Sequence, residues 1–94
     1  MSPYNLTLSL PERLTLTEAE LVLALLDREV ALHPDAGVVL DAASLKVFDS
    51  SALALLLALR RRQLARGRAL RVNGWPSRLS NLAALYGVRD LLGA

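Results

Sequence analysis

The chain has 94 residues, a formal net charge of +2 and no cysteine. Its length suits one domain and is too short for two. Without cysteine there can be no disulfide, thiol nucleophile or cysteine-ligated metal, and a single histidine without spaced companions predicts no metal site. We therefore expect a single domain over residues 1–94 that needs no cofactor.

The composition favours an aliphatic core and a cytoplasmic location. Hydrophobic residues make up 53% of the chain and aromatic residues only 4%. The longest uncharged apolar run, Ala52 to Leu59, is far shorter than the roughly 20 residues of a membrane span. The first residues also lack the basic stretch followed by an apolar one that marks a signal peptide. We expect a cytoplasmic protein that does not insert directly into a membrane.

The positive charge is concentrated in one cluster of arginines, namely Arg60, Arg61, Arg62, Arg66 and Arg68. A nucleic-acid surface combines such a cluster with aromatic platforms, and aromatic residues are scarce in this chain. The cluster falls late in a predicted helix, where cations complement the helix dipole. We interpret it as a solvated helix end and expect no nucleic-acid partner.

The first third of the chain predicts two strands and a helix. Residues 5–10 alternate polar and apolar side chains, and residues 13–16 do so again after a Pro-Glu turn. This favours an antiparallel hairpin or a bent pair of strands at a sheet edge. The sequence Thr17-Glu18-Ala19-Glu20 matches a capping box, in which Thr17 and Glu20 cap each other's backbone N–H groups. A helix is therefore expected from Thr17 to about Leu32.

The remaining chain alternates short strands and helices. The continuous apolar run at residues 37–41 is typical of a strand buried on both faces. A loop follows to residue 48, and we expect a long helix from Ser50 to Gly67, a strand at 69–73, a helix at 77–86 and a closing segment at 88–92. The order β-β-α-β-α-β-α predicts an α/β fold with a mainly parallel four-stranded sheet, an antiparallel edge and helical cover.

The start of the long helix carries the candidate functional residues. Asp49 is expected as an N-cap or as an anion in the first turn. Ser50 and Ser51 would then stand at a helix N-terminus, where backbone N–H groups and the dipole favour negative charge. Simple capping explains an Asp-Ser-Ser sequence as well. A phosphate on Ser51 would change the local charge by nearly two units, enough to reject a partner that packs there. No nucleophile, base and orienting group are spaced for catalysis, so we expect no enzyme.

The arrangement of these segments resembles the STAS family, which comprises anti-sigma factor antagonists and related domains. The similarity is carried by Val38-Val39-Leu40-Asp41, by Phe48-Asp49-Ser50-Ser51-Ala52-Leu53 with its leucine-rich helix, and by Leu70-Arg71-Val72-Asn73. Family members usually carry Gly where this chain has Ala52. The resemblance implies the STAS fold and a role in protein–protein switching.

Two branches of that family fit the two serines. In anti-sigma factor antagonists, a serine at the position of Ser51 is phosphorylated by a partner kinase, which blocks binding. In the small STAS subunit of Mla-type phospholipid-transport systems, the hydroxyl that matches Ser50 contributes to contact with the transporter ATPase. The resemblance therefore implies a protein partner, either an ABC transporter ATPase subunit or an anti-sigma factor kinase.

The leucines of the long helix favour the transporter branch. At about 100° per residue, one stripe that should face the sheet is formed by Leu53, Leu56, Leu57 and Leu64, whereas Leu55 and Leu59 lie on a different side. We expect Leu55 and Leu59 to be exposed beside the serines as a docking pair, unless another element or a second copy covers them. The favoured hypothesis is a non-enzymatic accessory subunit that docks on the ATPase of a lipid-transport ABC system through Asp49, Ser50, Ser51, Leu55 and Leu59. The alternative is an anti-sigma factor antagonist regulated by phosphorylation of Ser51, and the oligomeric state stays open.

Overall fold

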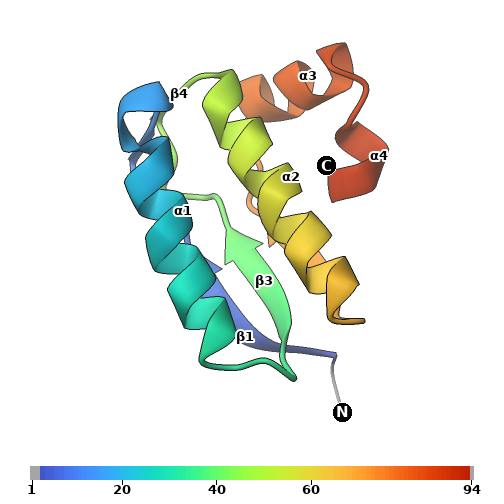
Figure 1. Ribbon diagram of the computed structural model, residues 1–94. Helices are drawn as coiled ribbons and strands as arrows, with labels where there is room; N and C mark the ends of the chain where they lie inside the picture. Colours follow the sequence, from blue (N-terminus) through green and yellow to red (C-terminus); the bar gives the residue numbers. More distant parts are fainter. Residues whose placement is uncertain (1–2, 94) are drawn as a thin grey trace.

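Three parallel strands form the centre of the computed structural model, which describes residues 3–93 (Figure 1). Their order across the sheet is β1 (Tyr4–Ser9), β3 (Gly37–Asp41) and β5 (Leu70–Asn73). Two long helices, α1 (Leu16–Ala31) and α2 (Ser50–Ala65), lie side by side across one face of the sheet. The short helices α3 (Ser77–Leu85) and α4 (Arg89–Leu92) pack against α2. The central strand β3 is buried because it has a strand on each side and helices on one face.

The predicted α/β class with a mainly parallel sheet is confirmed, but two details of the prediction are wrong. The central sheet has three strands instead of four, and the two strands expected to form an antiparallel hairpin at its edge pair in parallel with other strands. β1 pairs in parallel with β3, with Thr7 opposite Val39. β2 (Arg13–Leu14) pairs in parallel with β4 (Val47–Phe48), a strand in a segment that we expected to be a loop. The turn at Pro11-Glu12 leads the chain away from the sheet, and the Glu12 carbonyl then accepts hydrogen bonds from the backbone N–H groups of Lys46 and Val47. Parallel pairing lets β1 lay its apolar face under the helices, beside β3.

The N-cap of helix α1 is Thr15, two residues before the Thr17 that the sequence predicted. Its capping box is formed by Thr15 and Glu18: Thr15 Oγ1 accepts from the N–H of Thr17 at 3.3 Å, and Glu18 Oε1 accepts from the N–H of Thr15 at 3.0 Å. The pair Thr17 and Glu20 has the same spacing and competes for the same role. The fully buried Leu14 ends β2 directly before this turn, so the earlier box is the one that starts the helix.

The core is aliphatic, as expected, and α2 supplies more of it than one helical stripe. Leu55 is 3% exposed and Leu59 is 1% exposed, so the prediction that they form an exposed pair is wrong. The reason is that α2 has neighbours on several sides: α1 on one, β5 beneath, and α3 and α4 on another (Figure 1). Leu64, expected to face the sheet, is 54% exposed near the end of the helix.

A buried glutamine ties the end of α2 to the sheet. Gln63 is 1% exposed, and its Nε2 donates to the backbone carbonyls of Ala36 at 3.0 Å and Ala69 at 3.1 Å, which precede β3 and β5. Its Oε1 is buried without a hydrogen-bond partner. The same end of the sheet has no room for a side chain at Gly37, because a Cβ there would collide with the carbonyl oxygen of Pro3. Within residues 3–93, none of the helices is long and apolar enough to cross a membrane.

Candidate functional site

The N-terminus of α2 is capped as the sequence predicted. Asp49 has an extended backbone, and its Oδ1 accepts a hydrogen bond from the N–H of Ser51 at 2.8 Å. This satisfies one of the backbone donors that a helix start leaves without an intrahelical partner. The cap places Ser50 and Ser51 in the first turn of α2, at the end where α1 also begins (Figure 1).

The Asp49 carboxylate also reaches the other helix. Its Oδ2 accepts from the N–H of Leu16, the first residue of α1, at 3.1 Å. The hydrogen bond from Leu16, and after it the one from Ser51, lowers the pKa of Asp49 below its ordinary value because both stabilise the ionised carboxylate. The pKa of Glu18 is lowered in the same way by the backbone N–H and the hydroxyl of Thr15. Asp49 is therefore an ionised link between two helix starts, with both oxygens engaged.

The two serines face different surroundings. Ser50 is exposed and borders a pocket beneath α3 as well as a groove that leads to α4. Ser51 is half-buried and lines the groove between α1 and α2, together with Leu16, Leu23 and Leu55. A single substitution can therefore perturb one hydroxyl without the other.

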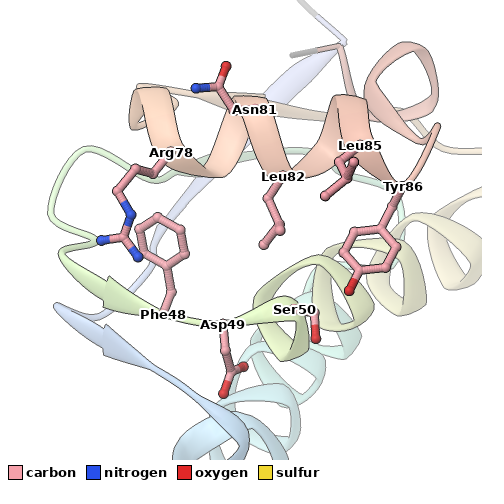
Figure 2. A pocket seen from close by; sticks show the side chains of 8 residues that line it. All are labelled: Phe48, Asp49, Ser50, Arg78, Asn81, Leu82, Leu85 and Tyr86. Carbon is pink, nitrogen blue, oxygen red and sulfur yellow. The ribbon is translucent and has the colours of Figure 1, made fainter.

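The pocket beneath α3 has a volume of about 450 Å³ and lies beside the start of α2 (Figure 2). Side chains from β4, from the start of α2 and from α3 line it: Phe48, Asp49, Ser50, Arg78, Asn81, Leu82, Leu85 and Tyr86. The guanidinium carbon of Arg78 lies 5.0 Å from the centroid of the Phe48 ring, a cation–π contact. The pocket thus combines a cation, apolar side chains and two hydroxyl groups.

Apolar side chains extend this pocket into a larger surface. Leu85 is 80% exposed, and Tyr86 and Leu16 are also largely exposed. The two shallow grooves on either side of the exposed Ala54 are lined mainly by apolar atoms. We call this area the serine-turn surface and define it by the exposed or half-buried residues Leu16, Ser50, Ala54, Leu57, Leu85 and Tyr86.

The structure changes the membership of the predicted site. Asp49, Ser50 and Ser51 lie together at the start of α2, but Leu55 and Leu59 point into the protein and cannot present a docking pair. Their place is taken by Leu85 and Tyr86 of the α3 segment, which sequence reasoning did not select as site residues. The sequence did contain a signal, since the Leu-Tyr-Gly end of that helix has apolar side chains beyond those that one core stripe requires.

The chemistry of this site is that of a binding surface. Hydroxyl groups, one guanidinium and several leucines offer hydrogen bonds, charge and apolar area, which are what a protein partner uses. Among residues 3–93 there is no group of three histidine, aspartate or glutamate side chains that could hold a metal ion.

Comparison with known families gives one match. The family model described as "Mlab, STAS domain" matches residues 1–93. The match runs through every element from β1 to α4, including the serine turn and the α3 segment. Comparisons with curated proteins and with solved structures found no match.

Proposed function

The chain belongs to the STAS domain family, and from this premise we propose that it is an accessory subunit that docks on the ATPase of a lipid-transport ABC system. STAS domains in general are protein-interaction modules with regulatory roles and without enzymatic activity. The matched model carries the Mlab description, and this supports the transporter branch over the antagonist branch. The proposed contact area is the serine-turn surface.

The observation that carries this proposal is the exposed apolar area around Ser50. Leu16, Leu85 and Tyr86 all lie largely in solvent. The two grooves beside Ala54 lead from Leu16 to Tyr86, and the pocket beneath α3 is lined by Tyr86 and Leu85 together. Contiguous exposed apolar patches of this kind mark interaction sites. Full burial of Leu16 or Leu85 in a partner would contribute about 1.5–3 kcal/mol each, before the cost of association is subtracted. A permanent apolar surface suits a stable subunit contact.

Ser50 would orient the two proteins at this contact through a hydrogen bond from its hydroxyl group. Its side chain is exposed, whereas the neighbouring Asp49 carboxylate already accepts two backbone hydrogen bonds. The hydroxyl can both donate and accept, so it can pair with backbone or side-chain groups of the ATPase. Its location between the pocket and the α4 groove places that hydrogen bond inside the apolar surface, where water would be displaced.

Co-purification with a lipid-transport ABC ATPase of the same organism tests the proposal. Ser50→Arg and Leu85→Asp should each weaken the complex by about tenfold or more, because each introduces a charge into a desolvated contact. Ser9→Arg is the matched control, since Ser9 is exposed on β1. If both site variants bind the ATPase as the wild type does, docking through this surface is excluded.

Control by phosphorylation of Ser51, as in an anti-sigma factor antagonist, is the second candidate function. The favouring observation is that the N–H of Ser51 is one of the two donors that hold Asp49 between the helices. A phosphate there would repel the Asp49 carboxylate and loosen its bond to Leu16. Incubation with a cognate anti-sigma kinase and ATP, followed by mass spectrometry, tests this candidate, and an unmodified Ser51 would count against it.

A further inference from the structure

Arg78 has no carboxylate partner in the part of the chain that the structure describes. Its guanidinium stacks on the ring of Phe48, and within residues 3–93 no carboxylate forms an ion pair with it. The nearest candidate in the pocket is Asp49, but its carboxylate points away from the pocket (Figure 2) and is engaged with Leu16 and Ser51. The guanidinium N–H donors of Arg78 are therefore available to a partner.

The position of Arg78 in α3 makes this free cation costly. It stands in the first turn of α3, a turn without acidic residues or a side-chain N-cap. Cations are unfavourable at this end of a helix because the dipole there is also positive. An anionic group on Arg78 would relieve this repulsion, so the local charge is complementary to an acid.

The two ends of the pocket differ in chemistry, one being cationic and the other mainly apolar. Arg78 and Phe48 form one end, Leu82 projects into the middle, and Leu85, Tyr86 and Ser50 lie toward the other end (Figure 2). A free anion would contact only the end of the pocket that Arg78 and Phe48 form. A protein segment that presents a carboxylate next to a large apolar side chain would use both the cation and the leucines.

We propose that this pocket recognises an acidic–apolar segment of the partner protein, with an Asp or Glu carboxylate on Arg78 and an adjacent apolar side chain between Leu82 and Tyr86. This inference rests on the proposed docking function and adds the chemistry of the partner to it. The guanidinium fork pairs with a carboxylate through two parallel hydrogen bonds. The Phe48 ring packs against one face of the Arg78 guanidinium and restricts its orientation. The N–H donors at the edge of the guanidinium are therefore ordered before the partner binds.

The test is a selection from a random peptide display library against the immobilised protein, without any ATPase. Enriched peptides should combine acidic and apolar residues. They should bind Arg78→Glu about tenfold or more weakly than the wild type, since a charge-assisted pair is replaced by repulsion. Arg61→Glu, an exposed change of the same charge on α2, is the matched control and should bind the peptides normally. Glutamate suits the first turn of α3, so Arg78→Glu should stay folded, which a thermal melt checks.

Three outcomes would overturn the proposal: enriched peptides without acidic residues, equal binding to Arg78→Glu and the wild type, or no enrichment over an unrelated protein. Displacement of the peptides by inorganic phosphate at low millimolar concentration would instead assign the pocket to a free anion. Because the ATPase is not used, the two hypotheses fail separately. Acidic peptides that bind while the ATPase does not co-purify would refute the docking function and leave the pocket assignment in place.

Discussion

The Oδ2 atom of Asp49 accepts a hydrogen bond from the backbone N–H of Leu16 at 3.1 Å, across 33 positions of the sequence. Since Oδ1 of the same carboxylate accepts from Ser51, one side chain caps the starts of α1 and α2 together. The serine turn is thereby fixed to α1 as well as to its own helix. Any change at Asp49 should act on the stability of both helices and on the shape of the serine-turn surface.

Replacement of Asp49 should show this double role in thermal stability. Asp49→Ala removes both hydrogen bonds, and we expect a melting temperature at least about 4–8 °C lower, the shift for one lost cap in a domain of this size. Asp49→Asn keeps one good acceptor and should fall between Ala and the wild type. Thermal melts followed by circular dichroism give the melting temperatures of the wild type, Asp49→Asn and Asp49→Ala. Equal melting temperatures for Asp49→Ala and the wild type would refute the shared cap.

The free energy of unfolding should also depend on pH, because the Asp49 carboxylate titrates. Its pKa is lowered in the folded protein, so its contribution is fully present above its ordinary pKa of about 3.8 and is lost as the pH falls through the folded value. The free energy of unfolding should therefore decrease below about pH 3.8 more steeply in the wild type than in Asp49→Asn, which does not titrate. Urea unfolding across this pH range measures the difference. Parallel curves would show that the carboxylate is not stabilised by folding.

Leu59 and Leu64 provide a test of which face of α2 is buried. Leu59→Ala should destabilise the protein by about 2–5 kcal/mol, because Leu59 is fully buried and truncation leaves a cavity. Leu64→Ala lies on the same helix at an exposed position and should change stability by less than about 0.5 kcal/mol. Denaturant unfolding compares the two, and similar values would contradict the burial of Leu59.

Gln63 should be important for folding and dispensable for docking. Gln63→Leu leaves the Ala36 carbonyl without its donor, which should cost about 1–3 kcal/mol, whereas the Ala69 carbonyl still accepts from the backbone N–H of Val38. Gln63→Glu should be worse at neutral pH, because a buried carboxylate cannot donate to these carbonyls and burial disfavours its charge. Its stability should improve at acidic pH, where the side chain is protonated. The same unfolding assay applies, and a Gln63→Leu protein as stable as the wild type would show that the Ala36 carbonyl does not need the Gln63 donor.

The strand pairing shows where sequence patterns lose their power. Alternation in residues 5–10 and the apolar run at 37–41 predicted two strands correctly. The pattern did not predict which strands pair: β1 pairs with β3, and the two-residue strands β2 and β4 pair with each other. A pattern of apolar residues records which face is buried and carries no information on which neighbour completes the sheet.

The capping residues also show which contacts the local sequence predicts and which it does not. Asp49 was identified as the N-cap of α2 from its place before Ser50 and Ser51. Its second bond, to Leu16, could not be read from spacing because it joins segments far apart in the chain. For α1, two Thr-x-x-Glu sequences overlapped, and the burial of Leu14 decided between them.

The local sequence by itself determined the α/β class, the STAS resemblance and the serine turn at the start of α2, since these depend on periodicity and on residues next to one another. Tertiary structure decided which leucines of α2 are buried, because that depends on how many elements surround the helix. It also decided that Ser50 lines the same pocket as Arg78, Leu85 and Tyr86, which come from a distant segment. The serines could be found from the sequence, whereas the surface around them exists only once α3 has packed against α2.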